Sequence, residues 1–270
     1  MKKSFGTILI SVLFIFQNNA VTAQEETPIF DTTNQHLLMS VVWYQNSAEM
    51  KALYYQSFNI AKMMVDQHLR TAGDIRKKAV VLDIDETVLD NSPFEADCIL
   101  TGKSYTSERW KAWTDLVQAD SLPGALEFTK YVKSKDVEVF YVSNRKEYEM
   151  KATIENLRKF GFPNAEEKYV LLKKDTGSKK ARREKISENY NIILLIGDNL
   201  GDFDEIFDKR KKNYGMGKVD DHKELFGKRF IILPNPMYGA WEKAIFQEDY
   251  SLSPAEKDSL RKESLKRIEK

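Results

Sequence analysis

Short runs of apolar residues alternate along the chain with stretches in which apolar residues recur every three or four positions. The apolar runs lie at 79–82, 137–142, 168–172, 192–196 and 229–233. Helical spacing marks 147–160 and 178–189, and two helices or one bent helix within about 32–70. Strands that alternate with helices predict a parallel sheet with helices on both faces, which is an α/β fold.

Two other parts of the chain break this alternation. Residues 91–135 are rich in Trp, Tyr, Ser and charged residues, with a Pro-Gly turn at 123–124 followed by a predicted helix from Ala125 to Ser134. The last 20 residues are highly charged and predict an exposed helix or a frayed tail. With 270 residues, the chain has room for one α/β domain, predicted over 24–270, and an inserted cap.

The first 23 residues are typical of a signal peptide. Met-Lys-Lys precedes an apolar stretch at 5–16 and a small-residue cleavage site that ends at Ala23. An uncleaved membrane anchor is the alternative, which the shortness of the apolar run disfavours. We therefore expect an exported mature chain that begins near Gln24.

Composition narrows the function classes. Lys and Arg number 42 against 41 Asp and Glu, and removal of Lys2 and Lys3 with the signal peptide leaves 40 − 41, a net charge of −1. Such a balance gives no sign of binding to a nucleic-acid polymer. Cys98 is the only cysteine, so no intramolecular disulfide can form and stability must come from packing.

The first apolar run ends in Asp83 and Asp85, which are two positions apart. In an extended strand such residues point to the same face. Two carboxylates ~4 Å apart repel by about 4 kcal/mol at an effective dielectric constant of ~20. A bound divalent cation or a protonated partner would offset that repulsion.

Further polar residues follow the later strands in the same way. The second strand ends in Ser143, and the fourth in a Gly-Asp-Asn-Leu-Gly-Asp stretch that contains Asp198 and Asp202. Lys179 lies between them in Lys-Asp-Thr-Gly-Ser-Lys. These four groups, in this order over about 120 residues, resemble the four motifs of the haloacid dehalogenase superfamily.

A narrower resemblance runs over most of residues 35–245. It is carried by DIDETVLDNSPF, Trp110-x-x-Trp113, Leu-Pro-Gly-Ala at 122–125, VFYVSNR and IGDNLGDFDE. These stretches resemble the bacterial class C acid phosphatases, which are secreted or lipoprotein acid phosphatases and 5'-nucleotidases. The resemblance implies a Rossmann-like core at 70–90 and 136–245, a small, mainly helical cap at about 91–135, and N-terminal helices at about 32–70.

The resemblance also implies catalytic roles. Asp83 would be the nucleophile that forms a phosphoaspartate, and Asp85 the general acid and base. The alternative for Asp83 is a helix N-cap at the end of a strand. Thr87 is expected to be a structural hydrogen-bonding residue of the turn.

Mg²⁺ is the implied cofactor. Its implied ligands are the carboxylates of Asp83 and Asp198 and the backbone carbonyl of Asp85, with a phosphate oxygen. Asp202 would lie just outside these ligands or hold a metal-bound water; alternatively, it is an acidic residue favoured in the first turn of a helix.

Ser143 and Lys179 are implied to hold the phosphoryl oxygens. Lys180 competes with Lys179 for this role, although the spacing from Asp175 favours Lys179. Asn144 and Arg145 either orient the loop after the second strand or are ordinary polar loop residues.

The implied substrates are phosphate monoesters, including nucleoside 5'-monophosphates. Tyr105 and Tyr238 are candidates to stack on a nucleobase, a contact worth ~1 to 3 kcal/mol per base. Phe94, Trp110 and Trp113 could also line the entrance. Cap aromatics are equally expected as packing residues, and all three histidines, His36, His68 and His222, are expected to be structural or surface residues.

Several alternatives stay open at this point. The same residues would serve a phosphotransferase, and a non-catalytic exported binding protein could share the fold. No cysteine lies near residue 23, so a lipidated membrane anchor is not expected and a periplasmic or secreted protein is. Association with an outer membrane and a homodimer are both left open.

Overall fold

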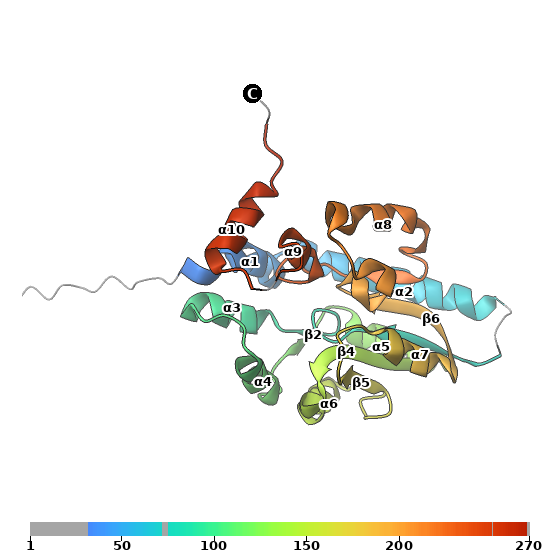
Figure 1. Cartoon of the computed structure of the whole chain (residues 1–270). Helices are drawn as coiled ribbons and strands as arrows, with labels where there is room; N and C mark the ends of the chain where they lie inside the picture. Colours follow the sequence, from blue (N-terminus) through green and yellow to red (C-terminus); the bar gives the residue numbers. More distant parts are fainter. Residues whose placement is uncertain (1–31, 72–74, 250, 269–270) are drawn as a thin grey trace, which may run out of the picture. The chain divides into compact units, whose positions relative to one another are not determined.

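The structure, a computed structural model, describes residues 32–71, 75–249 and 251–268 (Figure 1). The predicted signal peptide lies outside the described residues. Among the described helices, none combines the length and the apolar character needed to cross a bilayer.

A five-stranded sheet carries the fold. Its strands are β1 (Lys77–Leu82), β4 (Glu138–Lys146), β5 (Val170–Lys173), β6 (Tyr190–Gly197) and β7 (Phe230–Ile232). All neighbouring strands are parallel, in the order β5-β4-β1-β6-β7. The predicted α/β fold is confirmed, and β1 lies at the centre with β4 and β6 on either side.

Side chains of β1 alternate between two apolar cores, one on each face of the sheet. Val80 and Leu82 belong to the core that α2 (Ala48–Arg70) and α5 (Ala125–Ser134) cover. Ala79 and Val81 belong to the opposite core, which includes residues of α7 (Lys180–Ser187) and of the segment after β6. This alternation follows from the period of two in a strand.

Two helices precede the sheet, after a 3₁₀ turn at Thr32–Leu37. These are α1 (Leu38–Asn46) and α2, separated by Ser47, whose hydroxyl accepts the N–H of Met50 at 3.1 Å as a helix N-cap. The buried residues of α2 recur every three or four positions: Met50, Tyr54, Phe58, Ala61 and Val65. They form the stripe that packs toward the sheet.

The segment between β1 and β4 differs from the predicted cap of 91–135. It contains an antiparallel pair, β2 (Leu89–Asp90) with β3 (Asp120–Ser121), and the helices α3 (Ser92–Thr101) and α4 (Ser107–Asp115). The next helix, α5, packs instead on α2, with the rings of Phe58 and Phe128 5.3 Å apart. We therefore use "cap" below for residues 89–121.

The remaining elements follow the predicted alternation. A 3₁₀ turn at Glu147–Glu149 leads into α6 (Met150–Phe160). Beyond β6 the chain forms short 3₁₀ turns and α8 (Met216–Asp221) before β7, and then α9 (Ala240–Ile245). The charged C-terminal segment contains α10 (Pro254–Glu263).

Candidate active site

The loop after β1 brings Asp83 and Asp85 to the carboxyl end of the sheet. Asp83 follows the strand directly, and its N–H donates to the carbonyl of Ile196 in β6 at 2.9 Å. The chain then folds back tightly, because the carbonyl of Ile84 accepts the N–H groups of Val88 and Leu89, each at 2.9 Å. Asp83, directly after the strand, and Asp85, in the turn, thus lie at the carboxyl end of the sheet, where ligands bind in α/β folds.

This loop is also held from the N-terminal helices. The Tyr54 hydroxyl donates to the carbonyl of Glu86 at 2.5 Å, and the hydroxyls of Tyr54 and Tyr44 lie 2.5 Å apart. Glu86 has a positive φ of 53° and is fully buried. Thr87 takes part in the turn through its N–H, which donates to the carbonyl of Ile84 at 3.3 Å, whereas its buried hydroxyl has no partner among the described residues.

Three carboxylates gather on one side of this crevice. Asp83, Asp198 and Asp202 each offer an oxygen within 4.8 Å of the others. The ammonium of Lys179 contacts Asp83 and lies 2.6 Å from Asp202. The Lys179 side chain is only 5% exposed, so this ion pair is shielded from water.

Burial and mutual repulsion perturb the pKa of these groups. Burial raises the pKa of Asp83 to about 7, with Asp202 and Asp85 adding to the rise and Lys179 opposing it. Burial, followed by Asp202 and Asp83, raises the pKa of Asp198 well above its usual range. For Lys179, burial acts to lower the pKa, but the two aspartates outweigh it and the pKa rises.

The donor set fits a divalent cation with hard oxygen ligands. Asp198 is oriented by Asn235, whose amide donates to its Oδ2 at 2.9 Å. Asp202 lies within the carboxylate cluster, whereas the Asp85 carboxylate is not part of it. Close packing holds Asp202 there, because a Cβ on Gly197 would lie 2.1 Å from its Oδ2.

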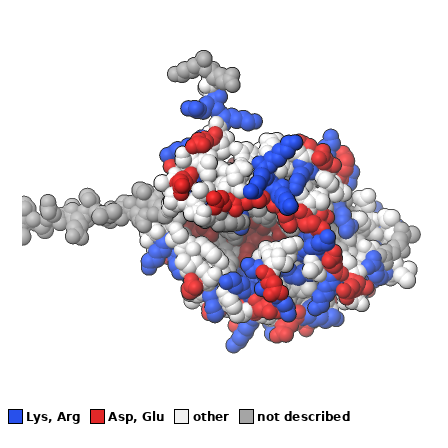
Figure 2. All heavy atoms as spheres, viewed as in Figure 1, with Lys and Arg blue, Asp and Glu red and all other residues white. Residues whose placement is uncertain are grey.

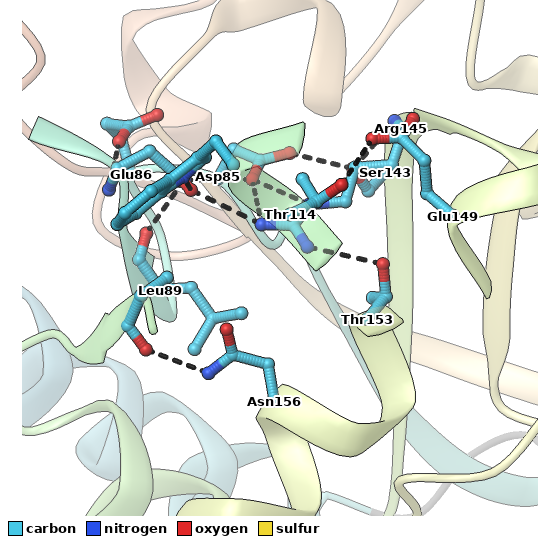
Figure 3. A network of polar contacts seen from close by, with 12 residues as sticks. Asp85, Glu86, Leu89, Thr114, Ser143, Arg145, Glu149, Thr153 and Asn156 are labelled. Carbon is cyan, nitrogen blue, oxygen red and sulfur yellow. Dashed lines mark hydrogen bonds and ion pairs between the residues drawn. The ribbon is translucent and has the colours of Figure 1, made fainter. Parts of the chain in front are cut away.

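The Asp85 carboxylate has a different environment, supplied by β4 and the cap (Figure 3). Its Oδ1 accepts hydrogen bonds from Arg145 Nε at 2.9 Å and from Asn91 Nδ2 at 2.9 Å, and lies 2.8 Å from Arg145 Nη2. Its Oδ2 accepts the hydroxyl of Ser143 at 3.1 Å. Three neutral or cationic side chains thus satisfy this carboxylate.

The structure separates the two candidate lysines. Lys180 is 53% exposed on the side chain and pairs with Glu205 at 2.6 Å, outside the crevice. Lys179 contacts the proposed nucleophile. Ser143, the other predicted phosphate-binding residue, lines the same crevice, although its hydroxyl here contacts Asp85.

A cavity of about 890 Å³ extends from the aspartates. Tyr105, Tyr238 and Trp110 are among the residues that line it, whereas Phe94 and Trp113 are not. In Figure 2 acidic and basic side chains are interspersed over the visible face, which is hollowed near its centre, with acidic groups visible inside. The cavity could therefore hold both a phosphoryl group and an attached organic group.

The sequence did not point to Asn91 and Asn235 as site residues, and it left the role of Arg145 open. Asn91 follows the Asp83 motif within Asp-Asn-Ser-Pro, and Asn235 lies in Pro-Asn-Pro-Met-Tyr-Gly. Each stands in a turn-forming stretch, which is the signal that could have drawn attention to it. Of the histidines, His36 lines the far part of the cavity, 4.0 Å from Glu242.

The sequence pattern of the HAD superfamily, subfamily IIIB (acid phosphatase), matches residues 11–241. The chain belongs to this acid phosphatase family. The family assignment agrees with the resemblance of the motifs at Asp83, Ser143, Lys179 and Asp198, and the fold agrees with it too.

Solved structures of class C acid phosphatases are similar over nearly the whole chain. One from Bacillus anthracis is 44% identical, with a TM-score of 0.84, and the match covers 88% of this chain and 100% of that one. A second structure of the Bacillus anthracis enzyme, with tungstate bound, is 42% identical with a TM-score of 0.83 and the same coverage. The predicted resemblance to class C acid phosphatases is confirmed.

Curated plant proteins are more distant relatives of this family member. Acid phosphatase 1 of Solanum lycopersicum is 25% identical over 173 residues, which cover 62% of this chain and 60% of the tomato protein. The Stem 28 kDa glycoprotein of Glycine max is 29% identical over 169 residues. The chain thus spans about 60% of the length of these curated relatives.

Proposed function

We propose that this family member is an acid phosphatase that hydrolyses phosphate monoesters through a phosphoaspartate on Asp83. The observation that carries the proposal is the pairing of two carboxylates in unlike environments at one cavity. Asp83 lies among acidic groups beside a buried Lys179, whereas Asp85 is hydrogen-bonded by Asn91, Ser143 and Arg145. Carboxylates placed in unlike environments can take different roles in one reaction.

The reaction begins with attack of a carboxylate oxygen of Asp83 on phosphorus. As the new O–P bond forms, the bond to the leaving oxygen breaks, and that oxygen takes a proton from Asp85. Lys179 is placed to balance the charge that spreads over the phosphoryl oxygens, and the motif resemblance assigns the same role to the hydroxyl of Ser143, which in this structure donates to Asp85. Stabilisation of this charge by fixed groups is a large part of catalysis by such sites.

Water then completes the cycle. Asp85, now deprotonated, accepts a proton from a water molecule, whose oxygen attacks the phosphorus of the phosphoaspartate. The bond between phosphorus and Asp83 breaks, and inorganic phosphate leaves. An acceptor alcohol in place of water would give transfer instead of hydrolysis by the same steps.

We propose that Mg²⁺ is held by the carboxylates of Asp83 and Asp198 and the backbone carbonyl of Asp85, with Asp202 beside them. The ion would neutralise charge on the phosphoryl oxygens and on the clustered carboxylates. The family membership and the carboxylate cluster support a divalent metal. The raised pKa of Asp83 and Asp198 supports it further, because burial and, after it, repulsion between the aspartates disfavour their negative charge, which a cation would stabilise.

Substrate and location are also proposed. Tyr105 and Tyr238 line the same cavity as the aspartates, which supports nucleoside 5'-monophosphates as substrates. The tungstate in the Bacillus structure supports an oxyanion site, since tungstate has the tetrahedral shape of phosphate. The first 23 residues support export to the periplasm or the medium, with cleavage near Gln24.

Phosphate release from p-nitrophenyl phosphate, 5'-AMP and 3'-AMP, with and without EDTA, tests these points together. We expect activity on all phosphate monoesters offered, a preference for 5'-AMP over 3'-AMP, and inactivation by the chelator. Equal rates with EDTA would refute the metal role, and equal rates on the two AMP isomers would refute the nucleotidase specificity alone. No turnover of any ester by the Mg²⁺-loaded protein would favour the non-catalytic binding protein.

A further inference from the structure

The two oxygens of the Asp85 carboxylate are not equivalent. Oδ1 receives Nε and Nη2 of Arg145 and the amide of Asn91, all within 2.9 Å. Among the described residues, Oδ2 receives only the hydroxyl of Ser143, at 3.1 Å. An oxygen that accepts three hydrogen bonds, two of them from a cation, has no room for a proton of its own.

Arg145 is itself fixed on every side. Its side chain is 1% exposed. Its Nη1 donates to the hydroxyl of Thr153 in α6 at 3.2 Å, and its Nη2 donates to Oδ1 of Asn91 at 3.3 Å. The guanidinium also lies 5.8 Å from the ring centre of Trp110 in α4, as a cation–π contact. A planar donor set held in this way fixes the direction of the carboxylate it binds.

Asn91 connects this arrangement to the cap. The amide nitrogen of Asn91 donates to Asp85, and its amide oxygen accepts the indole N–H of Trp113 in α4 at 2.9 Å. A second link joins α4 to the end of β4, because Glu149 accepts the hydroxyl of Thr114 at 3.2 Å and the N–H of Lys146 at 2.6 Å (Figure 3). The side chains of Trp113 and Asn91 therefore connect α4 to the Asp85 carboxylate by hydrogen bonds.

We propose that Arg145 is a positioning residue for the general acid. It holds Oδ1 of Asp85, so that Oδ2 carries the proton to the leaving oxygen. Asn91 connects this orientation of the carboxylate to Trp113 of the cap. In the transfer the Oδ2–H bond breaks, an O–H bond forms on the leaving oxygen, and the electrons of the broken P–O bond stay on that oxygen. The inference rests on the proposed role of Asp85 in phosphate ester hydrolysis.

Leaving groups of different basicity separate this role from a merely structural one. p-Nitrophenolate leaves without being protonated, whereas the alkoxide of glycerol 2-phosphate does not. A variant with a misdirected acid should lose far more rate on the second ester. General acid catalysis contributes ~10² to 10⁴-fold, which sets the size of the loss.

In Arg145→Gln we expect kcat/KM, which covers the steps up to departure of the leaving group, to fall by about 100-fold on glycerol 2-phosphate and by less than about tenfold on p-nitrophenyl phosphate. Arg145→Lys should behave similarly, because one ammonium cannot replace two fixed N–H donors and reach Thr153. Equal losses on the two esters would overturn the proposal.

Arg182 offers the matched control. It is also an arginine beside the site, but its guanidinium donates to the Ser143 carbonyl at 2.5 Å and to the Asn144 side chain at 2.7 Å, and not to Asp85. Arg182→Gln should therefore slow both esters by the same factor. A leaving-group dependence as large as that of Arg145→Gln would overturn the proposal.

Trp113→Phe keeps an aromatic ring, although a smaller one, and every charge but removes the indole N–H, so it tests the link should Arg145→Gln fail to fold. We expect a smaller loss with the same preference for the better leaving group, at an unchanged melting temperature. If Trp113→Phe hydrolyses both esters as fast as the parent protein does, the link to the cap is overturned. The proposed function and this inference fail in different ways. An active Asp83→Asn protein would refute the proposed function. If Asp83→Asn is inactive but Arg145→Gln slows both esters equally, only this inference is refuted.

Discussion

Asp83 and Asp85 are the same residue type two positions apart, yet their surroundings share almost nothing. The Asp83 side of the site, formed by Asp83, Lys179, Asp198 and Asp202, is crowded with carboxylates around one buried ammonium. The Asp85 side, formed by Asp85, Asn91, Ser143 and Arg145, surrounds one carboxylate with donors. One side is incomplete without added positive charge, and the other is already satisfied.

The arrangement of the sheet produces this difference. β1 is the central strand, and β6 on one side delivers Asp198 and Asp202 while β4 on the other delivers Ser143 and Arg145. Asp83, directly after β1, and Asp85, in the turn that follows, therefore meet different neighbours. This teaches that role assignment in such a site follows from the flanking strands and not from the aspartates themselves.

The largest effect should come from Asp83→Asn. An amide cannot form the phosphoaspartate, so we expect kcat/KM on p-nitrophenyl phosphate to fall by about 10⁴-fold or more, whereas kcat/KM of Asp85→Asn should fall less on this good leaving group. Initial rates of phosphate release, measured with Mg²⁺ present, check both. A folded Asp83→Asn protein as fast as its parent would remove the distinction between the two sides.

Loss of the metal should come next and should act chiefly on the Asp83 side, to which both proposed carboxylate ligands belong. We expect EDTA to abolish turnover and Mg²⁺ to restore it, and Asp198→Asn to need far more Mg²⁺ because it loses a charged ligand. Asp204→Asn is the control, since the Asp204 side chain is engaged in capping the N–H of Ile206 at 2.9 Å. Rate against Mg²⁺ concentration reports each; equal curves for the two variants would contradict the assignment.

Lys179→Met should reduce kcat by about 100-fold or more, because the buried ammonium that balances Asp83 and Asp202 is lost. The neighbouring Lys180→Met should have little effect, since that side chain is exposed and pairs with Glu205 outside the cavity. Steady-state rates on one ester suffice for the comparison. A greater loss from Lys180→Met would reverse the choice between the two lysines.

The smallest expected effect is the change of the melting temperature with pH in the absence of metal. Burial raises the pKa of Asp83 to about 7 and raises that of Asp198 as well, so the folded state holds protons that the unfolded state has released. Their stabilising contribution is full below the ordinary carboxyl pKa and is lost as pH rises through about 7. We expect the melting temperature in EDTA to fall between pH 5 and pH 8.

Added Mg²⁺ should raise that melting temperature more at pH 8 than at pH 5, since metal and protons compete for the same carboxylates. Asp198→Asn, which removes one of these groups, should flatten the pH dependence in EDTA. A melting temperature in EDTA that rises from pH 5 to pH 8 would contradict the description of the Asp83 side.

The sequence predicted what depends on local pattern. The five strands, the α/β class and the positions of Asp83 and Asp198 at strand ends follow from apolar runs that stop at polar residues. The contacts that orient these aspartates did not follow. Arg145 reaches Asp85 across 60 residues of sequence, and Asn235 reaches Asp198 across 37. Such contacts form only when the strands lie side by side, so the spacing of apolar residues along the sequence does not predict them.

The boundary of the cap illustrates the same limit. Residues 125–134 form a helix, as their pattern indicates, but whether that helix covers the site or the sheet depends on its partner. Phe128 meets Phe58 of α2, a helix from a distant part of the chain, and this contact places α5 on the core. Local propensity determines that residues 125–134 form a helix, and packing determines whether that helix belongs to the cap or to the core.

The hydroxyl of Tyr54 on the carbonyl of Glu86 has a practical consequence for anyone who trims this protein. Removing the residues before β1 would leave every proposed catalytic side chain and every strand of the sheet in the sequence. Yet the turn between Asp85 and Leu89 would lose its outside brace, along with the apolar stripe of α2 that covers the sheet. The leading helices are thus as much a part of the catalytic apparatus as the strands they precede.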